Sequence, residues 1–267
     1  KLSGVTKSAS SANVFVRGLG DRYNSTTLNG LTLPSENPIN KNVSLEFFGS
    51  GIIQSIGVNK TFNPLLNADV GGANIDIVSK ELHDNSVLEV SASIGANTQA
   101  IQADNFQRVD GTNWFGSLKE RTSPINSLNS YDFSNNWNPQ KMETPINSSF
   151  SVLAGKKFRV GANNLNVLLI GTMNSEYKYA EGIIRQTTND GTISLDQNTT
   201  RSEYNISKTA MANLKYSFGK HALTYNSLFI NDQVQSYERN IGFKLFDVSD
   251  HGFFRRSQVV DNNLFVN

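Results

Sequence analysis

The feature that most constrains this chain is a two-residue alternation of apolar and polar side chains, which recurs through the residues after position 82. Successive residues of a β-strand point to opposite sides, so such a pattern predicts strands with one apolar and one polar face. In VLEVSASIGA, the apolar face has Leu88, Val90, Ala92 and Ile94, and the polar face has Glu89, Ser91 and Ser93. KTAMANLKYSFG likewise sets Ala212 and Leu214 against Asn213. Strands of this pattern are typical of sheets that cross a membrane, where an arginine at Leu214 should be costly and one at Asn213 much less so.

About six segments are long enough to span a bilayer as strands. They cover residues 87–96, 147–158, 163–179, 208–219, 221–240 and 253–267. The joins are long at 100–147 and 181–202, short at 158–163 and 219–221, and intermediate at 240–252. Membrane barrels alternate short turns at one end with longer loops at the other. The sequence therefore predicts an antiparallel sheet whose longer loops all lie at one end.

Composition argues against several classes of function. No run of about 18 apolar residues occurs, so a transmembrane helix is not expected. Cysteine is absent and there are only three histidines, which leaves little material for a thiol, zinc or catalytic-triad site. The formal net charge is +1 with both signs interspersed, so no nucleic-acid surface is expected. We expect no enzymatic activity, no cofactor and no bound metal.

The first eighty or so residues differ, because they combine short strands with glycine-rich turns. VFV at 14–16 predicts a strand, and Asn29-Gly30 predicts a type I′ hairpin turn, since both positions accept positive φ angles. A short amphipathic helix is expected from the spacing of Leu45, Phe48, Ile52 and Ile53, and further strands from Ile56 with Val58 and Ile75 with Ile77. The outline is a small mixed α/β domain. GLGDRY is not a dinucleotide fingerprint, because Tyr23 stands where the third glycine is needed.

Four landmarks in this order resemble the plug domain of TonB-dependent outer-membrane transporters: VFVRGLG, LNGLTLP, IIQSIGVNKTFNP and ADVGGANIDIVSK. The resemblance covers nearly all of residues 11–82. In that family the plug lies inside a β-barrel of about 22 strands. The resemblance thus implies a mostly β protein, with the plug at 1–82 and about six of the first barrel strands at 83–267. We expect the natural chain to continue beyond both ends, because the TonB-contacting segment and the remaining strands are not among these residues.

The resemblance also implies site residues. The family's plug-to-barrel contact or gating positions correspond to Arg17, Gly18, Asn29, Gly30, Lys60, Gly71 and Gly72. We expect Arg17 to form an ion pair with the barrel and the glycines to let plug backbone pack closely in the lumen. In the long join 100–147, exposed aromatic residues are expected to contact an extracellular ligand or partner. These are Trp114, Tyr131 and Trp137.

Three functions are compatible with the sequence. The resemblance implies a transporter that binds a nutrient at the cell surface and imports it when the TonB complex remodels the plug. The chain would then lie in the outer membrane of a Gram-negative bacterium, with its loops outside and its plug accessible from the periplasm. One alternative is a structural subunit of a larger outer-membrane assembly, with a surface lipoprotein on its loops. The other is a soluble all-β binding module. The sequence does not identify the substrate as a small molecule, a glycan or a peptide.

Overall fold

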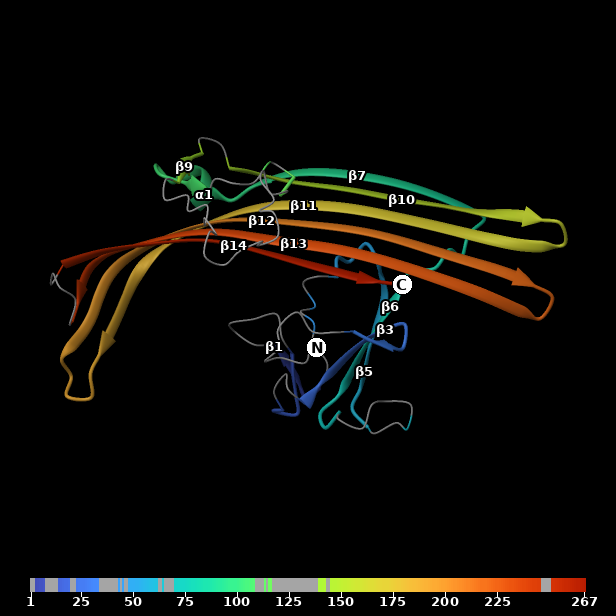
Figure 1. Ribbon diagram of the computed structural model, residues 1–267, viewed down its shortest axis with the longest axis horizontal. Coiled ribbons are helices and arrows are strands. Elements are labelled where there is room, and N and C mark those ends of the chain that lie inside the picture. Colours follow the sequence, from blue (N-terminus) through green and yellow to red (C-terminus); the bar gives the residue numbers. More distant parts are fainter. Residues whose placement is uncertain are drawn as a thin grey trace, which may run out of the picture.

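The computed structural model describes residues 3–7, 14–19, 23–33, 43, 45, 48–61, 64, 70–108, 113, 115–116, 139–142, 145–245 and 251–267. Over these residues the protein is mostly β, with four sheets and one short helix. One sheet is much larger than the others, and it arches over the N-terminal region, by which we mean the described residues up to 82 (Figure 1).

The large sheet has six strands, and each pairs with its neighbours in antiparallel fashion in the order β14-β13-β12-β11-β10-β7. The strands are β7 (Ser86–Ala96), β10 (Ile146–Val160), β11 (Asn163–Thr187), β12 (Ile193–Phe218), β13 (His221–Lys244) and β14 (His251–Val266). All six predicted strands are confirmed. The two short turns, at 161–162 and 219–220, lie at the same end of the sheet, as the alternation of join lengths predicted.

The prediction of a long loop at 181–202 is wrong. β11 and β12 stay paired as far as Thr187 and Ile193, so only residues 188–192 form the connection. These extensions are rich in threonine and isoleucine, which favour extended backbone, and Arg185 forms a 2.9 Å ion pair with Asp196 across the two strands. The strands therefore continue well past the length that a bilayer requires.

The N-terminal region forms a separate four-stranded sheet in the order β4-β3-β6-β5, beside a small β1-β2 pair. The strands are β1 (Val5–Lys7), β2 (Val14–Val16), β3 (Ser25–Leu28), β4 (Leu31–Thr32), β5 (Ile53–Asn59) and β6 (Asn74–Ser79). The predicted hairpin is confirmed, because β3 pairs with β4 and the two turn residues have φ angles of 51° at Asn29 and 81° at Gly30. The side chain of Asn29 also accepts the backbone N–H of Ser79 at 2.9 Å.

The prediction of an amphipathic helix over 45–53 is wrong for the residues that the structure describes there. Residues 48–52 form a bend and a turn in which Ile52 N–H donates to the Gly49 carbonyl, and Phe48 N–H donates to the Leu45 carbonyl. Glycines at 49 and 51 make a continuous helix unfavourable. The apolar assignment was nevertheless right, since Phe48 and Ile52 are buried in the core. No α-helix occurs in the described part of the N-terminal region, so the expected α/β domain is a β domain there.

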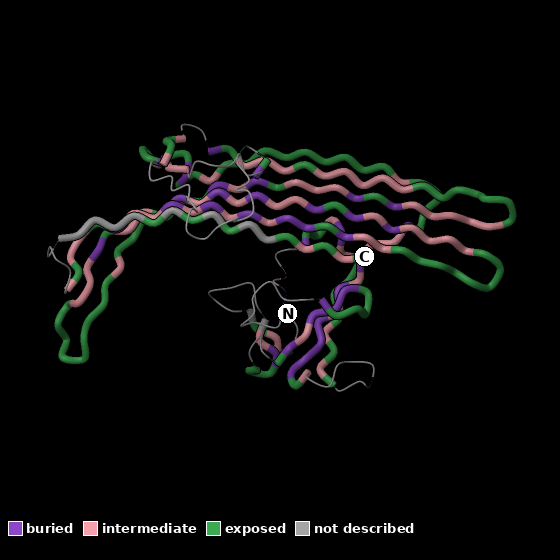
Figure 2. The backbone as a smooth tube through the Cα atoms, viewed as in Figure 1, coloured by how far each residue is buried: buried purple, intermediate pink, exposed green. Residues whose placement is uncertain are grey.

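The main core lies between the N-terminal region and the concave face of the large sheet. Its N-terminal members are Leu28, Leu33, Val43, Phe48, Ile52, Ile77 and Leu82, and its sheet members are Leu168, Ile170, Met211, Leu228 and Ile230. Figure 2 shows the buried residues concentrated in the N-terminal sheet and in the middle strands, whereas β7 is exposed along nearly its whole length. Apolar burial thus joins the two parts of the chain.

A second, smaller core lies on the convex face, near the end of the sheet away from the short turns. It is built around helix α1 (Thr98–Gln102) and the short pair β8 (Gln107–Arg108) and β9 (Gln140–Lys141), which follow β7 and lie on the opposite side of the sheet from the N-terminal region (Figure 1). The side chain of Asn97 caps α1 by accepting the N–H of Gln99 at 3.0 Å. The buried residues of this second core are Ala100, Phe106, Tyr177, Tyr204 and Ile206.

Candidate functional site

The convex face of the large sheet exposes a broad apolar surface. The strand register places a set of exposed large apolar side chains on this one face. They are Leu88, Val90, Ile94, Ile146, Phe150, Phe158, Val160, Leu169, Phe218, Leu223, Tyr225, Phe229 and Phe265. A monomeric soluble protein rarely exposes a contiguous apolar patch of this kind, so the surface marks an interaction site.

The height of this apolar band can be worked out from the strands. On β10 its continuous part runs from Phe150 to Val160, which is ~33 Å along the strand and ~25 Å after a tilt of ~40°. Ile146 and Ile94 lie beyond the Phe150 end of this part. The band ends on β12 at Lys208, the next convex residue after Ala210. Lys156 is a charged residue inside the band, and its ammonium lies 5.6 Å from the Phe158 ring centroid, toward the turn at 161–162. A lysine can reach an interface in this way while its stem stays in an apolar environment.

The concave face is polar except where the N-terminal region covers it. Beyond that contact, its side chains include the ion pairs Lys178–Glu176, at 3.1 Å, and Arg201–Glu203. The two faces of the same strands therefore differ as the alternation predicted. Asn213 does lie on the concave face, but it is only 1% exposed and donates to the side chain of Asn226. That arginine at Asn213 costs much less than arginine at Leu214 stays a prediction, and the burial of Asn213 argues against it, because a buried site does not accept a charge cheaply.

Several close contacts join the N-terminal region to the concave face. Lys215 of β12 forms a 2.8 Å ion pair with Glu81. A Cβ added at Gly51 would lie 3.4 Å from Thr172 Cγ2, and one added at Gly155 would lie 2.7 Å from Leu82 Cδ1. Sequence reasoning did not find these contacts, since nothing in the local pattern around Glu81 or Gly155 says which strand it meets.

The predicted plug residues are partly brought together. Arg17, Lys60, Gly71 and Gly72 line one pocket of about 330 Å³ in the N-terminal region. The Lys60 ammonium donates to the Ser3 carbonyl oxygen. Gly72 is required there, because an added Cβ would lie 2.3 Å from Asn24 Oδ1.

The other predicted residues lie apart from this pocket or outside the described chain. Gly18 and Gly30 have no described heavy atom within 4 Å of an added Cβ, so close packing against the large sheet is not what requires a glycine at either position. Among the described residues, Arg17 makes no ion pair with the sheet, and a role in gating stays a prediction for all seven positions. The aromatic residues of the long join, Trp114, Tyr131 and Trp137, lie outside the described residues.

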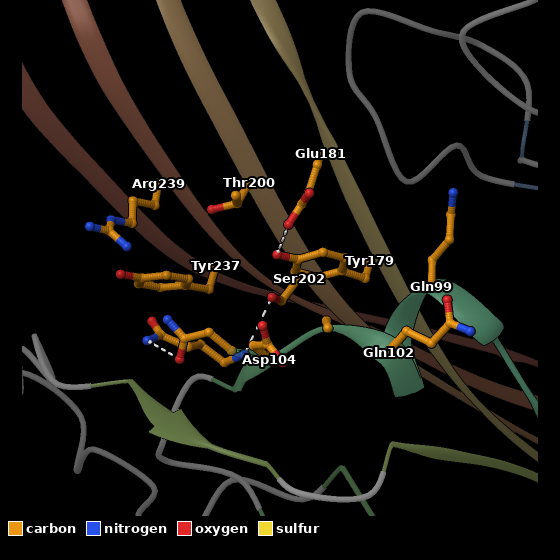
Figure 3. Close-up of a pocket in the computed structure, with 12 residues that line it drawn as sticks. Gln99, Gln102, Asp104, Tyr179, Glu181, Thr200, Ser202, Tyr237 and Arg239 are labelled. Atoms are coloured by element: carbon orange, nitrogen blue, oxygen red, sulfur yellow. Dashed lines mark hydrogen bonds between the residues drawn. The ribbon is translucent and has the colours of Figure 1, made fainter.

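A polar cavity of about 560 Å³ opens on the convex face beyond the apolar band. Three strands form its floor and the segment around α1 forms its rim (Figure 3). The lining residues are Gln99, Gln102, Ala103, Asp104, Asn105, Gln107, Tyr179, Glu181, Thr200, Ser202, Tyr237 and Arg239. The Tyr179 hydroxyl donates to the Glu181 carboxylate. Burial and this carboxylate raise the pKa of Tyr179, which lies outside the apolar band, to about 12, so the hydroxyl stays protonated.

The described residues contain no helix with the length and apolar character to cross a membrane. In that same part of the chain, no three His, Cys, Asp or Glu side chains gather as a metal site. Protein-family models and curated proteins were both searched, and neither contains a match to this chain.

Proposed function

We propose that this protein is a TonB-dependent outer-membrane transporter, in which residues 1–82 form the plug and the large sheet is part of the surrounding barrel wall. The observation that carries the proposal is the two-faced sheet, with an exposed apolar band ~25 Å high on the convex side and the N-terminal region packed against the concave side. A membrane explains both faces at once, because lipid contacts the outside of a barrel and the plug fills its inside.

The open sheet supports the barrel part of this proposal. β7 and β14 are its edge strands, and each has a row of backbone groups without a strand partner among the described residues. Unpaired backbone groups are too costly to expose to hydrocarbon, so strands cross membranes only as closed barrels. We infer that further strands pair with both edges in the membrane.

The concave wall indicates what kind of solute would pass. Beyond the N-terminal region it presents charged pairs such as Lys178–Glu176 and Arg201–Glu203, whose side chains are partly exposed. A wall of this chemistry suits a hydrated, polar solute. Import would then consist of binding followed by displacement of the plug by an external pull from the TonB complex, with no covalent chemistry.

A disulfide tether tests this function, and the structure selects its position. An added Cβ at Gly51 would lie 3.4 Å from Thr172 Cγ2, an atom in the position that a cysteine Sγ can occupy, so these two positions are close enough to be joined as a cysteine pair. The chain has no native cysteine, so no other pairing within it competes. In the full-length protein, Gly51→Cys with Thr172→Cys should abolish the nutrient-limited growth that depends on the gene, and a reductant should restore it.

The matched control is a disulfide that does not join the N-terminal region to the wall. Ser93 and Ser149 are cross-strand partners on β7 and β10, with their hydroxyl oxygens 2.6 Å apart. Cysteines at these positions should leave growth unchanged under oxidising conditions. Growth that persists with the Gly51–Thr172 tether fully oxidised would contradict plug movement and favour the structural-subunit alternative.

A further inference from the structure

The polar cavity on the convex face has no role in the proposed transport path, because it opens on the side of the sheet away from the N-terminal region. Its floor consists of two cross-strand rows on adjacent levels of β11, β12 and β13. One row is Tyr179, Ser202 and Tyr237, and the next is Glu181, Thr200 and Arg239. Because all six point to the same face, the regular register itself creates the floor.

The rim comes from the segment that follows β7. Gln99 and Gln102 of α1 lie on one side (Figure 3), and Asp104 and Asn105, which follow α1, also line the cavity. The Gln107 backbone N–H donates to the Ser202 hydroxyl at 3.3 Å, and this bond fixes the rim to the floor. The cavity is therefore formed by both the strands and the start of the long join, and the Gln107–Ser202 hydrogen bond connects the two.

The chemistry of the lining matches a carbohydrate. An amide side chain can bind two neighbouring sugar hydroxyls through one donor and one acceptor, and a carboxylate can bind them through two acceptors. Several side chains of both kinds converge in this cavity. Tyr179, which is partly exposed, adds a ring with an apolar face and a polar edge that suits a sugar ring, and the buried Tyr237 lies in the cavity floor. A volume of about 560 Å³ is in the range of sites for small organic ligands.

The height of the cavity indicates the source of the sugar. The apolar band ends near the level of Met173 and Lys208, and Tyr179 lies ~20 Å further along β11, or ~15 Å further from the membrane plane after tilt. This places the cavity beyond the acyl chains, at the depth where the sugars of a glycolipid project from an outer leaflet. We propose that the cavity binds the carbohydrate portion of an outer-leaflet glycolipid, an inference that rests on the outer-membrane location proposed above.

Adjacent threonines on β12 provide a matched test. Thr200 faces the cavity and Thr199 faces the concave side, so Thr200→Trp fills the cavity while Thr199→Trp places the same bulk on the opposite face. The probes are lipooligosaccharide from the host membrane, the free oligosaccharide released from it, and lipid A without core sugars. Binding is measured by calorimetry on the full-length protein in a detergent with an ethylene-glycol headgroup, because a sugar headgroup would compete.

Thr200→Trp should weaken binding of lipooligosaccharide and of free oligosaccharide at least about tenfold, which corresponds to about 1.4 kcal/mol. Thr199→Trp should change neither, and binding of lipid A should be insensitive to both variants. Gln102→Ala, at an exposed position of α1, should also weaken oligosaccharide binding, which keeps the test valid if the tryptophan variant fails to fold.

Equal effects of the two tryptophan variants, or no oligosaccharide binding by the unmodified protein, would overturn the inference. Tighter binding of free oligosaccharide than of lipooligosaccharide would assign the cavity to a soluble glycan and would overturn the glycolipid source. The free-oligosaccharide measurement requires no membrane and no transport, so its failure can be told apart from a failure of the proposed function.

Discussion

Arginine at Val90 should destabilise the folded protein by about 1–2 kcal/mol, and arginine at the adjacent Ser91 should cost far less. Val90 lies on the convex face and is 64% exposed, so the substitution disrupts no packed core in the described chain. Val90 is paired with Val152, which lies inside the Phe150–Val160 band and ~10 Å along the strand from its middle at Gly155. The cost therefore comes from placing a cation in hydrocarbon between the midplane and the edge of the band, where the penalty is smaller than at the midplane.

Ser91 is the control because it is exposed on the concave face, opposite Ser151, with Glu89 two residues away on the same face. The expected difference corresponds to roughly a 5-fold to 30-fold change in the ratio of folded to unfolded protein. It can be measured by urea titration of the full-length protein in lipid vesicles, with heat-modifiable migration as the readout of folding. Equal destabilisation by Val90→Arg and Ser91→Arg, or none by either, would refute the lipid-facing assignment.

Two further predictions concern the contact between the N-terminal region and the sheet. Gly155→Val should destabilise the protein by about 1–3 kcal/mol, because its Cβ would clash with Leu82. Gly171→Val, on the open convex face, should have little effect. Equal thermal stabilities of the two variants would contradict this prediction. A double-mutant cycle for Glu81→Gln and Lys215→Met should give a coupling energy below about 1 kcal/mol, since both side chains are more than a third exposed. A coupling of several kcal/mol would contradict this and would show that the ion pair is a main contribution to holding the N-terminal region against the sheet.

The strands of the large sheet were readable from the sequence because their pattern is local. A period of two fixes which residues share a face whatever the strand pairs with, so the faces of Val90, Ala212 and Leu214 could be assigned from neighbouring residues alone. The turn at Asn29-Gly30 was predictable for a similar reason, since positive φ angles depend on the residue type. The alternation of short and long joins identified the two ends of the sheet.

Local pattern misled where a tertiary contact or a competing preference decided the structure. Phe48 and Ile52 have a spacing that suits a helix, yet glycines at 49 and 51 and burial against the sheet favour a turn over residues 48–52 instead. Most of the loop expected at 181–202 is paired strand. The polar composition of this segment suggested a loop, but hydrogen bonds between the two strands stabilise an extended hairpin. Asn213 was correctly assigned to the concave face. Its burial, however, depends on residues outside its own strand, and the pattern within β12 does not predict them.

The sequence by itself determined the strands, their faces and the hairpin turns, because each depends on residues close together in the chain. The tertiary structure alone decided which face of the large sheet the N-terminal region covers and how the rim around α1 meets the strands to enclose the polar cavity. Both depend on contacts such as Glu81 with Lys215 and Gln107 with Ser202, which join residues far apart in sequence. Such contacts leave no periodic trace, since a side chain's type does not specify which distant partner completes its packing or its hydrogen bond.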